Sequence, residues 1–290
     1  MPHAAPYPLV FPAAEMPVDS GERGEAGTPP PPSSYDAVLF VSFGGPDGPD
    51  DVMPFLENVL RGRNVPRERM LEVAEHYQHF GGKSPINEQN LALIHALRAE
   101  LDNRGPRLPI YWGNRNWHPF LEDTLRAMAD AGIRRAIALV TSGFSCYSGC
   151  RQYRENIAAA AEPLGERAPV VDKIRVFFNH PGFVGPMAEN VQRAIAGLAG
   201  GDVPVLFTAH SIPMSMAESS KYGLQLHEAC RLVAEAAGVG DWELVFQSRS
   251  GPASQPWLEP DVCDAIRVRH AAGCRQLVIA PIGFVSDHME

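Results

Sequence analysis

The chain has 290 residues, of which 45% are hydrophobic and 20% are charged, which is enough for one large or two modest packed domains. Its net charge of −9 argues against a nucleic-acid partner and does not favour attraction to an anionic membrane. No apolar run has the length of a transmembrane helix, and no Lys or Arg precedes Arg23 to form the basic region of a secretory signal. Five cysteines, an odd number, then indicate reduced thiols and predict a cytoplasmic protein.

The N-terminal 34 residues differ in composition from the rest of the chain. They contain nine prolines, including the run Pro29–Pro32, and no periodic apolar pattern. Such a segment cannot bury enough apolar surface to offset the entropy of ordering it. We therefore predict a disordered tail over residues 1–34 with no catalytic part.

The first predicted strand, residues 37–41, ends at Phe43-Gly44-Gly45-Pro46. Paired glycines let a ligand approach the backbone closely, but the third glycine of a dinucleotide fingerprint is missing. An amphipathic helix over residues 52–60 follows and ends at Arg61-Gly62-Arg63. These two guanidinium groups can compensate the helix dipole or grip a carboxylate in a bidentate manner.

Residues 76–85 combine aromatic side chains, glycines and a proline, which predicts a shaped loop rather than a helix centre. Its aromatic rings would suit a flat aromatic ligand, while Ser84 can also cap the next helix. Further strands are predicted at residues 108–112 and 136–140, with a helix between them.

Beyond residue 168 the alternation of strands and helices starts again. Strands are predicted at residues 173–177, 203–207, 243–246 and 277–280. Alternating βα units predict parallel sheets flanked by helices. We expect two Rossmann-like α/β domains, residues 35–170 and 171–290, that face each other across a cleft.

The strand at residues 203–207 leads into Thr208-Ala209-His210-Ser211-Ile212-Pro213. Pro213 ends the strand, so His210 is predicted at its carboxyl end, where open α/β sheets bind ligands. A histidine there can equally be a core residue bonded to a backbone carbonyl. A second polar segment, Gly283–Glu290, follows the strand at residues 277–280. A histidine and a carboxylate from two strand ends would suit a divalent metal or proton transfer.

Four motifs together carry a resemblance to a known family. They are the His210 segment, Gln247-Ser248-Arg249-Ser250-Gly251-Pro252, Pro256-Trp257-Leu258-Glu259-Pro260-Asp261, and Pro281–Glu290. From Tyr35 to Glu290 the chain resembles the ferrochelatases, and more closely their actinobacterial coproporphyrin III branch. The resemblance implies a lyase of heme biosynthesis that inserts Fe²⁺, as substrate metal, into coproporphyrin III to give coproheme. Protoporphyrin IX is the alternative substrate, and the porphyrin is expected in the cleft between the domains.

The resemblance also implies roles for individual residues. His210 is expected to be the main metal ligand and proton acceptor, with Glu290 as its carboxylate partner. Phe43 stands where some bacterial relatives carry a tyrosine, so a hydroxyl ligand is missing there. The remaining expected substrate contacts are porphyrin-contacting residues and propionate-binding cations: Tyr77, Ser84, Tyr153, Arg63 and Arg115.

Cys150 matches one cysteine ligand of a [2Fe–2S] cluster in the actinobacterial relatives, whose other three ligands lie near their C-terminus. Cys263 and Cys274 do not match those positions, so we expect the cluster to be incomplete in this chain. Because the chain stops at Glu290, we expect the C-terminal domain to be truncated, with lower activity or stability than an extended form. A cobalt chelatase and a non-catalytic porphyrin-binding protein are the remaining alternatives. The oligomeric state stays open, and a monomer is compatible with the sequence.

Overall fold

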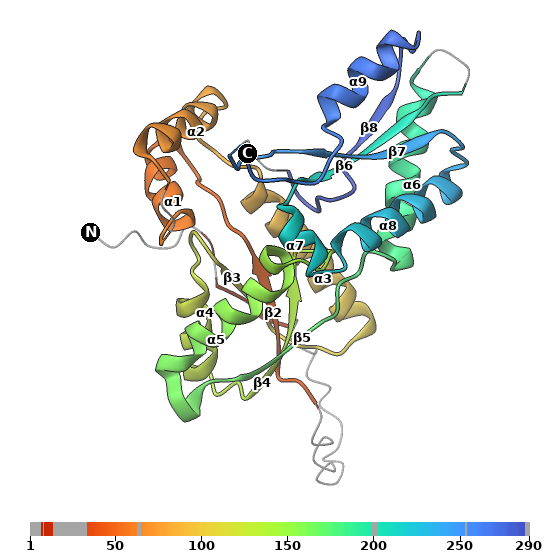
Figure 1. Cartoon of the computed structure of the whole chain (residues 1–290). Helices are drawn as coiled ribbons and strands as arrows, with labels where there is room; N and C mark the ends of the chain where they lie inside the picture. Colours follow the sequence, from red (N-terminus) through yellow and green to blue (C-terminus); the bar gives the residue numbers. More distant parts are fainter. Residues whose placement is uncertain are drawn as a thin grey trace. The chain divides into compact units, whose positions relative to one another are not determined.

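The computed structural model describes residues 7, 9–13, 34–62, 65–198, 202–252 and 254–287 (Figure 1). The chain divides into two compact units, the first comprising residues 1–141, 153–174 and 286–290, and the second residues 142–152 and 175–285. Each contains a sheet rich in parallel strands with helices against it, so the predicted α/β class is confirmed. The domain boundary expected at residue 170 and the expected cleft stay predictions.

The first unit contains a five-stranded sheet in the order β1-β3-β2-β4-β5. All neighbouring strands are parallel except β1, which pairs antiparallel with β3. The strands are β1 (Val10–Phe11), β2 (Ala37–Ser42), β3 (Ile110–Asn114), β4 (Arg135–Val140) and β5 (Val170–Lys173). β2 is buried along its whole length, which explains why its sequence is an unbroken apolar run.

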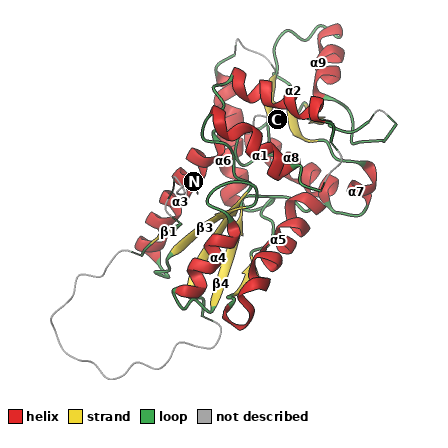
Figure 2. Ribbon diagram, turned by 90° about the vertical axis from the view of Figure 1, so that its left-hand side faces the viewer, coloured by secondary structure: helices red, strands yellow, loops and turns green. Residues whose placement is uncertain are grey.

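Helices cover both faces of this sheet (Figure 2). The helices of this unit are η1 (Pro49–Asp51), α1 (Val52–Val59), α2 (Arg67–His79), α3 (Ile86–Arg104), α4 (Leu121–Asp130), α5 (Gln152–Ala161) and η3 (Glu162–Arg167). Helix α3 lies against one face and α4, α5 and η3 lie against the other, whereas α1 and α2 pack in a separate cluster around Phe55. Alternate residues of β2 point to opposite faces. Phe40 packs in the cluster that contains Ile94 of α3, whereas Leu39 packs in the cluster that contains Leu125 of α4 and Ile157 of α5.

The second unit contains a three-stranded parallel sheet in the order β7-β6-β8. Its elements are η2 (Tyr147–Arg151), α6 (Pro181–Ala196), β6 (Val205–His210), α7 (Met214–Glu218), α8 (Tyr222–Ala237), β7 (Trp242–Gln247), α9 (Val262–Ala271) and β8 (Val278–Ala280). Helices α6 and α8 pack on one face around Phe207, and α9 packs on the other around Leu206.

Local signals in the sequence explain where several of these helices begin and end. The Asp261 carboxylate accepts a hydrogen bond from Cys263 N (2.8 Å) and so caps the first turn of α9. Gly238 ends α8 in the left-handed conformation, with φ of 73°, that an L-residue with a side chain disfavours. Among the helices of the described residues, none combines the length and the apolarity needed to cross a membrane.

The structure differs from the sequence-based prediction in three segments. Val10–Phe11, inside the expected tail, form β1 because β3 offers them a free edge. Residues 76–79, expected in a loop, are the last turn of α2, since Ala74 and Tyr77 bury one helical face; Gly81 then turns the chain at a φ of 82°.

The third difference is the strand expected at residues 173–177, which in fact ends at Lys173 and belongs to the first sheet. The apolar residues after it do not join a sheet: Ile174 is exposed, whereas Val176, Phe177 and Phe178 are half-buried. Phe177 packs against Phe183 (5.9 Å between ring centroids), and Phe178 packs against Phe144 (6.3 Å). An apolar run of this length cannot distinguish burial in a sheet from burial in an aromatic cluster.

Candidate functional site

In the first unit, two predicted substrate contacts leave the sheet as neighbours because they follow adjacent parallel strands. Phe43 follows β2 and Arg115 follows β3, and the last residues of these strands, Ser42 and Asn114, are paired. The backbone continues this pairing beyond the sheet. Arg115 N donates to Ser42 O (3.1 Å), and Asn116 N donates to Phe43 O (3.1 Å).

The Arg115 guanidinium lies between two aromatic rings and is held by an amide. Its central carbon is 4.6 Å from the centroid of the Tyr153 ring and 5.6 Å from that of Phe43. Its Nε donates to Asn156 Oδ1 at 2.8 Å. A cation over aromatic faces is stabilised by the ring quadrupoles, and a guanidinium stays protonated. The structure therefore brings Phe43, Arg115 and Tyr153 together around one oriented positive charge.

Tyr77 belongs to an aromatic cluster centred on Phe55. The Phe55 ring lies 6.2 Å from Phe43, 6.0 Å from Tyr77 and 6.3 Å from Trp117, all edge-on. Only 3% of Tyr77 is exposed, so most of its surface packs within the unit. Phe43 packs against this cluster, to which helices α1 and α2 contribute.

Ser84 lies next to the paired glycines that follow β2. Ser84 N donates to Pro46 O (2.9 Å), and Ser84 Oγ accepts from Ile86 N (3.4 Å) at the start of α3. A Cβ atom on Gly45 would lie 2.6 Å from Ser84 Cβ and 2.7 Å from Ile86 Cγ2. Glycine is thus required here by close packing within the protein, which the sequence alone could not distinguish from close approach of a ligand.

In the second unit, His210 is the last residue of β6 and is half-buried. Its Nδ1 lies 2.5 Å from Ser211 O. A carbonyl oxygen can only accept a hydrogen bond, so this contact places a proton on Nδ1. In a neutral imidazole the lone pair is then on Nε2, the atom that can bind a metal or accept a proton.

The main chain around His210 is anchored by neighbouring residues. Its own carbonyl accepts a hydrogen bond from the Tyr222 hydroxyl (3.1 Å), and burial raises the pKa of Tyr222, so this hydroxyl stays protonated. Ser211 N donates to Gln247 O (2.8 Å), and Ser211 Oγ donates to Leu258 O (2.8 Å). Gln247 and Leu258 belong to two of the motifs on which the family resemblance rests.

The motif that follows β8 also packs against the end of β6. Gly283 N donates to Thr208 O (3.0 Å), and a Cβ on Gly283 would lie 2.6 Å from Ala209 Cβ. All four motifs therefore have residues in or next to the β7-β6-β8 sheet. The two strands that precede His210 and Gly283 are direct neighbours, since β6 pairs with β8.

Two residues of the expected site, Arg63 and Glu290, lie outside the described residues. Cys150 is half-buried in η2, and the nearby Cys146 Sγ accepts a hydrogen bond from Gly149 N (3.1 Å). Within the described part of the chain, no three His, Cys, Asp or Glu side chains gather closely enough to hold a metal ion. A [2Fe–2S] cluster needs four ligands, so the described residues do not fit one.

Asn156 is a residue of this site that the sequence did not suggest. It lies three positions after Tyr153 on α5, and this spacing places both residues on one helical face. This three-residue spacing is the signal in the sequence that could have indicated Asn156. The partner Arg115, however, is distant in the sequence, so nothing linked it to Asn156 before the fold was known.

Comparison with known proteins gives a consistent result. The family model described as Ferrochelatase matches residues 35–290. A ferrochelatase of Rhodopirellula baltica is 65% identical over 259 residues, covering 88% of this chain and 74% of the relative. A coproporphyrin III ferrochelatase of Streptomyces coelicolor is 53% identical over 279 residues, with 89% and 74% covered. One of Frankia alni with the same description is 54% identical over 275 residues, with 90% and 70% covered.

Proposed function

Because this chain belongs to the ferrochelatase family, we propose that it inserts ferrous iron into coproporphyrin III and releases coproheme. A ferrochelatase is a lyase with two substrates, Fe²⁺ and a porphyrin. In the reaction, two pyrrole N–H protons leave the ring and the metal binds to the four nitrogens, so charge is conserved. The substrate is supported by the several relatives at 51% to 54% identity that are described as coproporphyrin III ferrochelatases.

The proposed catalytic residue is His210, and the contact between its Nδ1 and Ser211 O carries this proposal. The contact leaves the Nε2 lone pair for chemistry. A neutral imidazole can accept a pyrrole proton and can also bind a divalent metal. Because the histidine is the last residue of a strand hydrogen-bonded on both sides, its ring needs little reorganisation before the reaction.

Glu290 is the proposed carboxylate partner. A carboxylate near a histidine lowers the electrostatic cost of placing a dication at the site and can pass on the released protons. This assignment rests on the resemblance of Pro281–Glu290 to the family motif.

The first unit supplies the proposed porphyrin contacts Phe43, Tyr77, Ser84 and Tyr153. Arg115 is proposed to bind a propionate, because its guanidinium is already oriented by two rings and by Asn156. Arg63 is proposed as a second propionate contact on the resemblance alone. The Phe43 side chain has no oxygen, so it offers no ligand to a metal.

Coproporphyrin III and protoporphyrin IX differ in the number of propionates, so the test compares them directly. Anaerobic turnover with Fe²⁺ is measured for each porphyrin, and kcat/KM is compared. We expect coproporphyrin III to be preferred by at least about tenfold, which corresponds to about 1.4 kcal/mol of differential transition-state binding. Preference for protoporphyrin IX would replace the proposed substrate. Tight binding of either porphyrin without turnover would favour the non-catalytic porphyrin-binding alternative.

Two further properties remain proposals. Cys150 is proposed as one ligand of a [2Fe–2S] cluster on the family resemblance; the other cysteines of this chain do not complete that cluster, and no step of the proposed reaction depends on it. A cytoplasmic location rests on the composition and the reduced cysteines.

A further inference from the structure

A short N-terminal segment packs on the first sheet beside the proposed porphyrin contacts. Val10 and Phe11 pair with Tyr111 and Ile110 of β3, and Trp112 N donates to Leu9 O at 2.8 Å. Before this strand, the Tyr7 ring lies 5.1 Å from the Trp112 ring, centroid to centroid. The strand pairing and the ring contact together fix where the Tyr7 hydroxyl lies.

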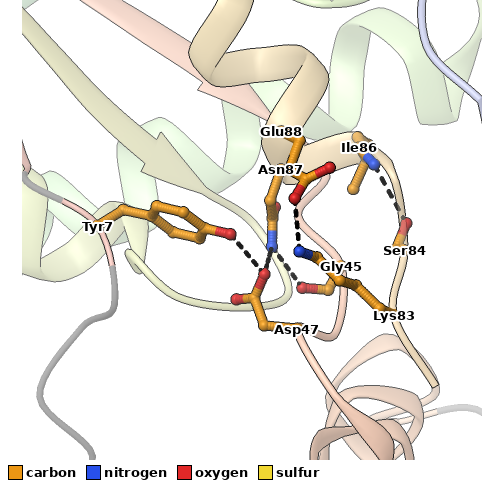
Figure 3. Close-up of polar contacts among 8 residues, drawn as sticks. All are labelled: Tyr7, Gly45, Asp47, Lys83, Ser84, Ile86, Asn87 and Glu88. Atoms are coloured by element: carbon orange, nitrogen blue, oxygen red, sulfur yellow. Dashed lines mark hydrogen bonds and ion pairs between the residues drawn. The ribbon is translucent and has the colours of Figure 1, made fainter. Parts of the chain in front are cut away.

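The Tyr7 hydroxyl donates to Asp47 Oδ1 at 2.6 Å. Figure 3 shows this hydroxyl and the Asn87 amide converging on the same carboxylate oxygen. Asn87 Nδ2 lies 3.1 Å from Asp47 Oδ1 and 2.7 Å from Gly45 O, so it joins the carboxylate to the loop after β2. A hydroxyl and an amide thus hold one oxygen of Asp47 from two different parts of the chain.

The Tyr7 hydrogen bond matters because the second carboxylate oxygen of Asp47 has no donor among the described residues. Asp47 Oδ2 is buried and has no hydrogen-bond partner among the described residues. Leaving a buried polar group unpaired is costly, so Asp47 depends on the two donors at Oδ1 to keep its position. Burial, together with the hydrogen bond to Asp47, raises the pKa of Tyr7 and keeps the phenol protonated as a donor.

The loop held in this way packs against a second loop, which carries the proposed substrate contact Ser84. Asp47 forms an antiparallel bridge with Lys83, and Ser84 N donates to Pro46 O. Gly45 is packed so tightly against Ser84 that no Cβ fits between them. A displacement of Asp47 would therefore be transmitted through the loop to Ser84.

From this geometry we infer that Tyr7 is a positioning residue for porphyrin binding. The N-terminal segment of residues 7 and 9–13 acts as a strap: its strand pairs with β3, and its Tyr7 hydroxyl holds Asp47 and thereby the Gly45–Ser84 contact. The inference rests on the proposed function, because Ser84 is a proposed porphyrin contact. It assigns a role in substrate binding to a segment that its composition predicted to have no catalytic part.

The test uses Tyr7→Phe in the full chain, which removes the hydroxyl and keeps the ring against Trp112. Two quantities are measured: amide hydrogen exchange of residues 44–47 and 82–84 without ligand, and the Kd for coproporphyrin III by fluorescence quenching. The matched control is Tyr111→Phe, since the Tyr111 hydroxyl makes no hydrogen bond to a described residue. Thermal unfolding of all variants shows that they are folded.

We expect faster exchange in both loop segments for Tyr7→Phe, together with a Kd raised about three- to thirtyfold, as expected for loss of one hydrogen bond to a carboxylate. The value of kcat should stay within about twofold, because Tyr7 acts on binding and not on the reacting atoms. Unchanged exchange would overturn the strap, and faster exchange with an unchanged Kd would overturn its role in positioning.

A second comparison separates the hydrogen bond from other effects of the substitution. In an Asp47→Ala background, Tyr7→Phe should have no further effect on Kd, because its acceptor is gone; a full additive effect would overturn the inference. The wild-type chain distinguishes the two proposals. If it binds coproporphyrin III without turnover, the proposed catalysis fails, whereas exchange and Kd still decide the role of Tyr7.

Discussion

The two units fix their functional side chains by different means. In the first unit, side chains hold side chains: two rings and Asn156 orient Arg115, and Gly45 makes room for Ser84. In the second unit, the main chain holds His210 through the Ser211 carbonyl and through the pairing of His210 with Gln247 of β7. In the first unit, a substitution disturbs several neighbouring side chains and should weaken porphyrin binding. The arrangement in the second unit allows the imidazole to be removed without loss of the fold, so its effect should be on chemistry.

The largest expected effect is that of His210→Ala. Loss of the proposed proton acceptor and metal ligand should lower kcat by about 10²- to 10⁴-fold, while porphyrin binding changes little. Anaerobic turnover and fluorescence titration measure the two quantities. His227→Ala, which replaces an exposed histidine on α8, is the control and should keep normal turnover. A His210→Ala chain that retains more than about a tenth of the activity would contradict the assigned role.

Gly283→Ala tests how far the main chain positions His210. The new Cβ would lie 2.7 Å from Ala209 Cα, a backbone atom of the strand that ends at His210, so the strand itself must shift. We expect a loss of about 1–3 kcal/mol in the free energy of unfolding, with reduced turnover. Urea unfolding measures the first effect. Gly240→Ala is the control, because no atom lies within 4 Å of its new Cβ. Equal stability of the two variants would contradict the prediction.

Gly45→Ala is the equivalent change in the first unit, and its expected effect is smaller. Its Cβ would lie 2.6 Å from Ser84 Cβ, which moves only with its backbone, but Ile86 Cγ2 and Ser84 Oγ at 2.7 Å belong to side chains that can partly rotate away. We expect a loss of stability nearer to about 1 kcal/mol, with weaker porphyrin binding. Gly48→Ala is the matched control, since its Cβ would enter open space. If Gly45→Ala binds coproporphyrin III as tightly as Gly48→Ala does, Ser84 does not contact the porphyrin as proposed.

Asn156→Ala should release the Arg115 guanidinium without removing its charge. The Kd for coproporphyrin III should rise about two- to tenfold, because orientation of the cation is lost. Asn190→Ala on α6 is a control with the same chemistry, as the Asn190 side chain accepts a hydrogen bond from Arg193 on the exposed surface. A rise in Kd of equal size in both variants would show that the effect is not specific to Arg115.

The smallest expected effect is in the core of the second unit, where Cys230 should not react with a thiol reagent. Cys230 is fully buried, and burial raises the pKa of its thiol, so little thiolate forms as the pH approaches about 8.5. Cys263 is exposed and should react with a thiol reagent. Mass spectrometry of the labelled chain distinguishes the two. Labelling of Cys230 before unfolding would show that the core around α8 opens in the native state.

Much of the site in the second unit could be predicted from the sequence. An apolar run followed by His210 and Pro213 placed the histidine at a strand end, because a buried parallel strand is apolar throughout and proline cannot continue it. In the first unit the same reasoning located Phe43 and Arg115 after their strands but did not show that they share a guanidinium–ring stack. That contact joins residues far apart in the sequence, and hydrophobic periodicity carries no information on such pairs.

The sequence by itself determined the α/β class, the alternation of elements, the family motifs and the position of His210 at the end of a strand. These features follow from local chemistry: apolar periodicity, proline and glycine at strand ends, and acidic or polar caps. Only the tertiary structure decided that β5 completes the first sheet, that Val10–Phe11 pair with β3, and that Tyr7 reaches Asp47. The physical reason is that each of these contacts depends on a partner far along the chain, and the free energy of burying or pairing a group is defined only once that partner is in place.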